Sequence, residues 1–360
     1  MIGYRIPSCG FRGLAAVLIA GLILLSGCAA GSHRSRVTPV YYPPPPSVPR
    51  VVFVGDLADL QFKSRDRSAM ERFLFGPSDT TGGRIGKPFG MAFSGQGLFV
   101  CDTRAGLVHV FDFDTGRHRT LGASGPGRLL KPLAVDVTTN GPSYVADPDL
   151  GEVTVYDTSG DVVAALPPRR PEPFEPVDVA TAGGAVYVVN RAMRRVEVLD
   201  PETGSVVRVV GEGRLSLPSG IAVDDRGHVF VSDVMQCRVH EYDDTGAFVR
   251  YIGRPGDRAG EFARPKHLAV GPDGILFVVD AGFQRVEMFD RQGRCLMLFG
   301  GPGDGPGCLS VPAGVAIAPA SVPSLQERVP DGFETKYFIF VSDQFGPWRV
   351  RVYAFGRGVR

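Results

Sequence analysis

Apolar and polar positions follow the same order six times along the chain. Each copy starts at a proline and runs through a short apolar segment, a glycine-rich turn in most copies, an aromatic and β-branched segment that ends in a carboxylate or amide, and an alternating segment. The prolines are Pro88, Pro132, Pro176, Pro218, Pro265 and Pro312, at steps of 44, 44, 42, 47 and 47 residues. A fixed period of this length predicts a solenoid, a propeller or an array of repeats.

The content of the copies decides among these architectures. In the copy that starts at Pro218, residues 220–223 are apolar and small, as a fully buried strand should be. Residues 230–233 and 239–242 predict two further strands, and a Thr-Gly turn leads into a fourth over residues 247–253. No copy contains a segment of helical periodicity. Four antiparallel strands per copy, repeated around an axis, predict an all-β, six-bladed β-propeller of four-stranded blades.

The two ends of the repeat region predict how the ring closes. The sixth copy lacks an outer strand, because the chain stops soon after Phe355, and a spare strand stands before the first copy at Val51–Gly55. We expect this N-terminal strand to close the last blade, which would leave the ring without a free edge there. Residues Ser64–Phe75 carry apolar side chains at helical spacing and predict a short helix on the rim.

Composition sets limits on the partners and on the redox chemistry. The chain has 39 basic and 38 acidic side chains; Arg5 and Arg12 lie in residues 1–27, so the remainder has 37 basic and 38 acidic side chains. Such a balance predicts no nucleic-acid partner. Cys295 and Cys308 are close enough in sequence to form a disulfide, and two separate thiols are an equal alternative.

The N-terminus predicts export from the cytoplasm. A basic start is followed by an apolar run over residues 14–25, too short to span a bilayer comfortably, which predicts a cleaved signal peptide over residues 1–27. Leu25-Ser26-Gly27-Cys28 resembles the bacterial lipobox, and this resemblance implies a lipid on Cys28. An ordinary signal peptide or an uncleaved anchor are the alternatives.

Two further features bear on the location. No aspartate follows the cysteine, which by the same resemblance implies the outer membrane, on its periplasmic side or at the cell surface, if the cell is Gram-negative. Residues 28–50 contain a run of four prolines, which predicts an extended, semi-rigid linker. The predicted organisation is thus a signal peptide over 1–27, an acylated linker over 28–50 and a propeller over 51–360.

The repeat motif resembles a known family. Residues 218–243 read Pro-x-Gly-Ile-Ala-Val-Asp, then Val-Phe-Val-Ser-Asp, then Arg-Val-x-x-Tyr-Asp, and this pattern resembles the NHL repeat. With the lipobox and the proline-rich linker, the chain looks like a bacterial NHL-repeat lipoprotein of the cell envelope. Ala134, Asp178 and His267 stand where the motif has glycine, which makes these positions candidates for a site.

The carboxylates that end the second predicted strand recur in nearly every copy. They are Asp102, Asp147, Asp233, Asp280 and Asp343. An aspartate at a strand end accepts backbone N–H bonds and fixes the following turn. Their recurrence therefore predicts a role in blade architecture and not in catalysis.

Candidate ligand-binding residues lie at the predicted axial mouth and on the face of the inter-blade connections. We expect Asp178, Asn190 and His267 to approach the mouth, because each stands at the same end of the blade. Asp, Asn and His side chains together can bind calcium or zinc, although the positions of the histidines do not support a three-histidine zinc site. The arginine-rich connection face fits an acidic glycan or protein, or a solvated rim with local salt bridges. Its candidate arginines are Arg104, Arg191 and Arg194.

Two functions from different classes fit these observations. The first is a lipid-anchored binding or scaffolding module for a protein or glycan partner, with no catalytic residue and no cofactor. The alternative is a metal-dependent hydrolase or lyase at the axial mouth, similar to lactonase propellers or to peptidyl-hydroxyglycine lyases. The sequence does not predict the oligomeric state. The hairpin over Ala318–Lys336 is longer than in the other copies and is expected on the face opposite the connections.

Overall fold

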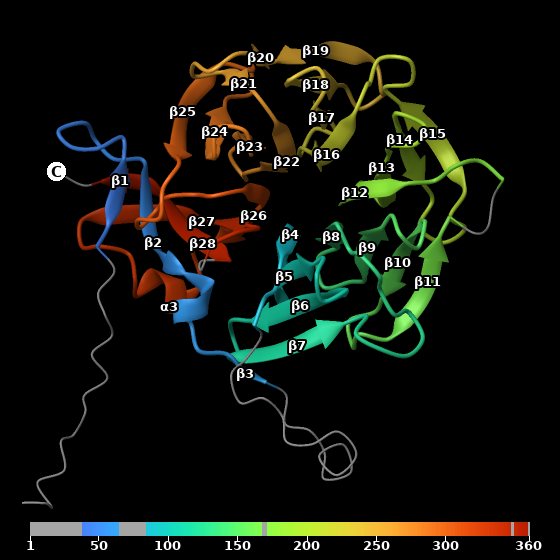
Figure 1. Cartoon of the computed structure of the whole chain (residues 1–360), viewed down its shortest axis with the longest axis horizontal. Helices are drawn as coiled ribbons and strands as arrows, with labels where there is room; N and C mark the ends of the chain where they lie inside the picture. The colour runs from blue at the N-terminus through green and yellow to red at the C-terminus, as the bar shows by residue number, and fades with distance from the viewer. Residues whose placement is uncertain (1–37, 65–83, 168–170, 347–348, 359–360) are drawn as a thin grey trace, which may run out of the picture. The chain divides into compact units, whose positions relative to one another are not determined.

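The fold is described from a computed structural model over residues 38–64, 84–167, 171–346 and 349–358. Within residues 38–360, six antiparallel sheets surround a common axis and form a six-bladed β-propeller (Figure 1). In the described residues, no helix has the length and the apolar character that a membrane crossing needs.

Each blade starts at the axis and proceeds outward strand by strand. The innermost strands are β4 (Pro88–Ser94), β8 (Ala134–Val137), β12 (Pro176–Ala182), β16 (Pro218–Val223), β22 (Pro265–Val270) and β26 (Pro312–Pro319). The second strands are β5 (Gly97–Asp102), β9 (Ser143–Asp147), β13 (Ala185–Asn190), β17 (Val229–Asp233), β23 (Leu276–Asp280) and β27 (Phe333–Asp343). The third strands are β6 (Leu107–Asp112), β10 (Glu152–Tyr156), β14 (Arg195–Leu199), β18 (Arg238–Tyr242), β24 (Arg285–Phe289) and β28 (Val350–Gly358). Every inner strand starts at or within two residues of a repeat proline, as the repeat predicted.

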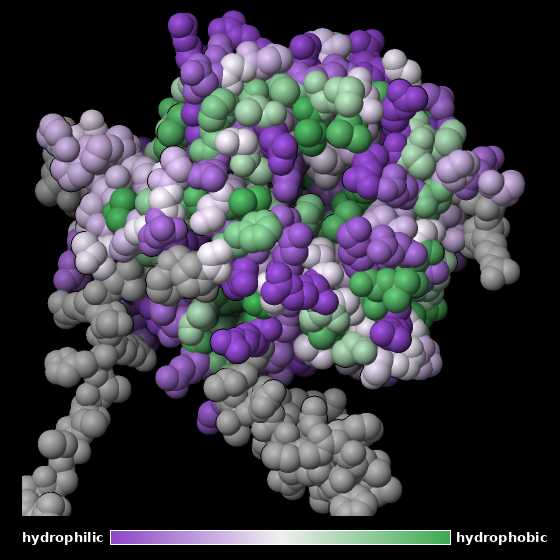
Figure 2. Space-filling view, in the orientation of Figure 1, coloured by the Kyte–Doolittle hydropathy of each residue, from purple (hydrophilic) through white to green (hydrophobic). Residues whose placement is uncertain are grey.

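The outermost strands of the first five blades are half exposed. They are β7 (Arg117–Leu121), β11 (Val162–Leu166), β15 (Val206–Val210), β19 (Phe248–Ile252) and β25 (Cys295–Gly300). In the sixth blade the fourth strand is β2 (Val51–Asp56), which is buried at every position. Exposed and half-buried positions alternate along β11, β19 and β25, as expected for strands with one solvated face. Hydrophobic and hydrophilic side chains are interspersed over the face drawn in Figure 2, so that face presents no single broad apolar surface.

The predicted N-terminal strand closes the sixth blade. β2 pairs antiparallel with β28, and the buried Asp56 and Arg351 bring their side chains within 3.3 Å at this seam. Burial raises the pKa of Asp56 to about 6, and the charge of Arg351 opposes this rise. A further strand, β1 (Val40–Tyr42), pairs with β2. Part of the segment predicted as a linker is therefore a strand of the sixth sheet.

Small elements decorate the blades. β3 (Lys63–Ser64) pairs with β7, and β20 (Arg254–Pro255) pairs with β21 (Glu261–Phe262), both in parallel. A 3₁₀ turn, η1 (Leu57–Asp59), follows β2, and a short helix, α3 (Pro323–Gln326), lies in the long hairpin between β26 and β27. Helical structure thus enters one repeat, which the periodicity did not predict. Of the helix predicted over Ser64–Phe75, Ser64 ends β3 and the rest lies outside the described residues.

The cysteines of the described residues are free thiols. Cys101 is buried, and Cys237, Cys295 and Cys308 are half-buried. Of the two alternatives for Cys295 and Cys308, the structure therefore has separate thiols. Burial and the neighbouring Glu287 carboxylate raise the pKa of Cys295 to about 11, so this thiol stays protonated at neutral pH.

The aspartates at the strand ends are architectural, as predicted. In the fourth blade, Asp233 accepts backbone N–H bonds from Ser216 and Leu217 in the entering loop. It also accepts N–H bonds from Met235 and Gln236 in the following turn. One buried carboxylate thus joins the connection that enters the blade to the turn that leaves its second strand.

Removing that carboxylate should destabilise the ring strongly. Asp233→Ala would leave four backbone donors without their acceptor, and we expect it to lower the free energy of unfolding by about 3 kcal/mol or more. Asp233→Asn should cost less, because an amide oxygen still accepts such bonds and Asn190 occupies the same position in the third blade. Urea denaturation of the two variants measures the difference; equal losses would contradict the assignment.

Candidate functional site

Six residues, each two positions after a repeat proline, form a ring around the axis. They are Gly90, Ala134, Asp178, Gly220, His267 and Gly314. A Cβ atom on Gly90, Gly220 or Gly314 would lie 2.6, 2.2 or 2.3 Å from a backbone oxygen of the next blade. Glycine is therefore required wherever the next inner strand comes this close. This ring is the narrow end of the axial channel.

Asp178 and His267 fill two of the positions that glycine occupies elsewhere. Asp178 Oδ2 accepts the Ile221 N–H at 2.9 Å, and His267 Nδ1 accepts the Val315 N–H at 3.4 Å. Ile221 and Val315 stand at the same position of the next blade, three residues after its proline. Both side chains therefore join one inner strand to the next, where the other blades use close backbone contact.

The two side chains also face each other across the fourth blade. His267 Nε2 lies 3.6 Å from Asp178 Oδ1, with Asp178 1% and His267 9% exposed. Because Nδ1 accepts the Val315 N–H, the neutral ring carries its proton on Nε2, toward the carboxyl group. Burial raises the pKa of Asp178 to about 8, against the N–H bonds from Ile221 and Val179, and burial lowers the pKa of His267 to about 4. At neutral pH both groups are thus mostly uncharged.

Asn190 does not join this pair, so the expected trio of Asp178, Asn190 and His267 is wrong. Its side chain turns toward the loop before β12, where it accepts the Glu175 N–H and donates to the Pro173 oxygen. It takes the place that an aspartate has in the other blades. Among the described residues, no group of three or more His, Cys, Asp or Glu side chains is arranged to hold a metal ion.

The candidate arginines of the connection face differ in their surroundings. Arg191 forms a two-pronged ion pair with Glu175. Arg104 and Arg194 form no ion pair with any described residue. Further arginines of this face are also paired with carboxylates, as Arg195 is with Glu197 and Glu212, Arg254 with Glu261 and Arg285 with Glu287. Much of this face is therefore a rim with local salt bridges, one of the two alternatives left open above.

A cavity of about 250 Å³ lies in the channel, on the side of the ring away from the connections. Its walls come from all six inner strands, and His267 lines it at the ring end. The position four residues after each repeat proline contributes one lining residue per blade. These residues are Ala92, Asp136, Ala180, Ala222, Ala269 and Ala316. Asp136 is thus the one ionisable side chain in a layer that is otherwise alanine.

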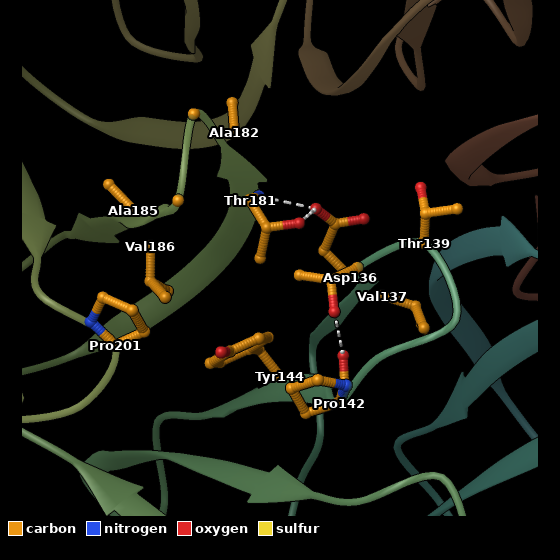
Figure 3. Close-up of a pocket in the computed structure, with 13 residues that line it drawn as sticks. Asp136, Val137, Thr139, Pro142, Tyr144, Thr181, Ala182, Ala185, Val186 and Pro201 are labelled. Atoms are coloured by element: carbon orange, nitrogen blue, oxygen red, sulfur yellow. Dashed lines mark hydrogen bonds between the residues drawn. The ribbon is translucent and has the colours of Figure 1, made fainter.

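Asp136 was not among the candidate site residues expected from the sequence, although the repeat pattern distinguishes it. Aligning the copies at their prolines shows alanine in five of them and aspartate in one. Asp136 Oδ2 accepts two hydrogen bonds from Thr181, from its N–H at 2.6 Å and from its hydroxyl at 2.8 Å (Figure 3). Burial raises the pKa of Asp136, and the nearby Asp178 adds to this rise, while the bonds from Thr181 oppose it.

A groove of about 400 Å³ lies beside this carboxylate, between the second and third blades (Figure 3). Asp136 and Thr181 line both the groove and the channel cavity, so the two spaces meet at this pair. Tyr144, Pro142 and Pro201 supply much of the apolar wall, and other lining residues carry hydroxyl and backbone groups. Such a mixture of apolar walls and a few polar groups can orient a small ligand.

The pair of Asp178 and His267 makes the stability of the ring depend on pH. Folded Asp178 keeps its proton up to a pH of about 8, and folded His267 takes one up only below about 4, against ordinary pKa values of 3.8 and 6.5. Between about pH 4 and 6.5 the pair binds about one proton in the folded and in the unfolded protein, so it does not change the free energy of unfolding with pH. From about pH 6.5 to 8 the folded pair binds one proton more, and the free energy of unfolding falls by about 1.4 kcal/mol per pH unit.

Asp178→Asn should remove that fall. His267 is then the only group of the pair that titrates. Its contribution to the free energy of unfolding should rise between about pH 4 and 6.5 and stay constant at higher pH. Urea denaturation of the variant and of the wild type at each pH in this range gives the two free energies of unfolding. Their difference as a function of pH measures the change. Asp304→Asn is the control, because Asp304 is exposed. An Asp178→Asn profile parallel to that of the wild type would contradict the assignment.

The fold resembles those of known enzymes, without close sequence similarity. No protein-family profile matches the chain, and no curated protein sequence matches it. A gluconolactonase from Xanthomonas campestris has a TM-score of 0.55 and 14% identity over 85% of this chain and 89% of that one. A streptogramin B lyase has a TM-score of 0.53 and 13% identity over 75% of this chain and 84% of that one.

A third neighbour is the virginiamycin B lyase of Staphylococcus aureus, solved with quinupristin as a variant inactivated by replacing a histidine with alanine. It has a TM-score of 0.52 and 13% identity over 74% of this chain and 84% of that one. At such identities these likenesses show the fold alone. The NHL repeat stays a resemblance of the sequence motif. The chain is a six-bladed β-propeller whose structural neighbours are of the virginiamycin B lyase and gluconolactonase type.

Proposed function

We propose that this protein is a binding module of the cell envelope that recognises a protein or glycan ligand in the channel and groove that meet at Asp136. The observation that carries the proposal is the single carboxylate in a layer of alanines. Five blades are built with alanine at the same place, so the repeat itself does not require a carboxylate there. The bonds from Thr181 use one oxygen of Asp136, and the position of this carboxylate where two cavities meet favours a ligand for the other oxygen.

The shape of the site favours a small part of a larger partner. A groove of about 400 Å³ is near the lower end of the range for ligand pockets and accommodates a few sugar or amino-acid residues. Asp136, which already accepts two bonds from Thr181, offers its other oxygen to a donor on the ligand. A loop of a protein or one end of a glycan would fit this description.

The proposal places the protein at a membrane. The lipobox-like sequence that ends at Cys28 supports a lipid anchor there, and the predicted signal peptide supports a location outside the cytoplasm. If the cell is Gram-negative, the alanines after Cys28 favour the outer membrane.

A second candidate function is a hydrolase or lyase that acts in the same cavity. Two observations favour it: the structural neighbours include a gluconolactonase and lyases, and His267 lines the cavity with Asp178 behind it. A carboxyl group whose pKa is raised to about 8, beside an imidazole, can move a proton. However, Nδ1 of His267 accepts the Val315 N–H and Nε2 faces Asp178, so neither nitrogen is free for a substrate.

Binding that depends on Asp136 is the decisive test. The lipidated full chain, purified in detergent, would be used to capture partners from an envelope extract that contains both proteins and glycans. Asp136→Ala restores the residue of the other five blades, so the ring should fold normally while the affinity for the captured partner falls about tenfold or more. Asp304→Ala is the control and should bind like the wild type. Unchanged capture by Asp136→Ala would contradict the proposal, and turnover of lactones would favour the second candidate.

The lipid anchor can be tested independently. Mass spectrometry of the mature N-terminal peptide should show Cys28 as the first residue, carrying two or three acyl chains. Cys28→Ala should release the protein from the membrane fraction into the soluble envelope fraction. An unmodified cysteine on a membrane-bound wild-type protein would overturn the anchor and leave the binding site untouched.

A further inference from the structure

The connection-face end of the axis is covered by a lysine that lies on an aromatic ring. Lys266 in β22 places its Nζ 5.3 Å from the centre of the Phe89 ring in β4. Between these two strands lies β26, which neighbours both, and its Ala313 is wholly buried. The lysine side chain therefore reaches from the fifth blade past the start of the sixth to the first.

Two more cationic residues flank this contact in the chain: Arg264 stands two residues before Lys266, and Lys87 stands two residues before Phe89. The Nζ of Lys87 lies 5.6 Å from the centre of the ring of Phe345, a residue that is 52% exposed. Burial of Lys266, together with the charges of Arg264 and Lys87, lowers the pKa of Lys266 to about 8. None of these three cationic side chains forms an ion pair with any described residue. They are called the axial cation cluster below.

The carboxylates close to this cluster are already engaged. Asp102 accepts the N–H of Lys87, and Asp280 accepts the N–H of Arg264. Both carboxylates are wholly buried in their turns, where they hold the backbone. No described carboxylate therefore balances the positive charge of the cluster in a direct pair.

Farther from the axis, much of the positive charge of the same face is neutralised locally, although Arg104 and Arg194 have no carboxylate partner among the described residues. Arg191 is paired with Glu175, Arg254 with Glu261, and Arg285 with Glu287. A long acidic peptide laid over this face would meet these carboxylates and be repelled. The charge pattern thus suits one compact anionic group at the axis, carried on a neutral body.

We infer that the axial cation cluster of Lys87, Arg264 and Lys266 binds one compact oxyanion, the carboxylate or sulfate group of an otherwise neutral sugar. Ammonium groups donate charge-assisted hydrogen bonds to such a group, and a guanidinium can hold two of its oxygens. Phe89 and Phe345 supply flat apolar walls beside it. This site uses residues separate from Asp136 and lies beyond the narrow ring, so it goes beyond the function proposed above.

Calorimetric titration of the lipidated full chain in detergent with galacturonic acid tests the inference, with galactose as the neutral match. Galacturonate should bind and galactose should not, and inorganic sulfate should compete. Lys266→Met keeps the apolar stem over the sixth blade and should weaken galacturonate binding about tenfold or more. Lys336→Met removes the same charge from the exposed long hairpin and should change nothing.

The pH dependence separates the charge of Lys266 from its packing. Raising the pH from about 7 to about 9 should weaken binding, because Lys266 loses its proton, and Lys266→Arg should keep binding at the higher pH. The other charged groups that act on Lys266 are Arg264 on its own strand and Lys87 beside β4.

Three results would overturn the inference. They are wild-type binding by Lys266→Met, equal binding of galactose and galacturonate, and tighter binding of tetraglutamate than of galacturonate. Absence of any heat signal up to about 10 mM galacturonate would also overturn it. Asp136→Ala should leave galacturonate binding unchanged, so failure of this inference and failure of the proposed function are distinguishable.

Discussion

The ring depends on one interaction repeated at the end of each second strand. There a buried carboxylate or amide oxygen accepts N–H bonds from the loop that enters the blade and, in most blades, from the turn that follows. Asp102, Asp147, Asn190, Asp233, Asp280 and Asp343 all take part. These bonds fix where each inner strand begins. The spacing of the inner strands, and with it the width of the channel, follows from that placement.

Because the strand ends hold the architecture, the side chains that face the axis are free to differ between blades. Glycine or alanine suffices at most of these positions, since they need only allow neighbouring strands to approach. Asp136, Asp178 and His267 are the exceptions. Asp178 and His267 replace close backbone contact with side-chain bonds, whereas Asp136 bonds to Thr181 of the next blade and also faces the space where a ligand can enter. The same kind of departure from the repeat thus has two different physical roles.

Much of the fold could be predicted because every copy carries the same information. A six-fold proline period, strand-length apolar runs and a spare strand at Val51 determine the blade count, the strand order and the closure. The candidate site was harder, because it depends on where individual side chains turn. Asn190 stands at the expected end of its strand, yet its amide bonds to the loop before β12 and not across the axis. Aligning the copies would have found Asp136. The ion pair of Arg191 with Glu175 lies at two positions that the repeat brings together in other blades too, but it depends on side chains that differ from copy to copy.

The pairing of β1 with β2 limits how far the ring can stand from its anchor. Only the residues between Cys28 and Val40 remain to connect the proposed acylated cysteine to the edge of the sixth blade. At about 3.5 Å per residue, a fully extended chain of this length reaches about 40 Å. If Cys28 carries the proposed lipid, this length sets an upper limit on the distance between the sixth blade and the bilayer surface. A partner of the propeller would then have to come within that distance of the surface to be bound.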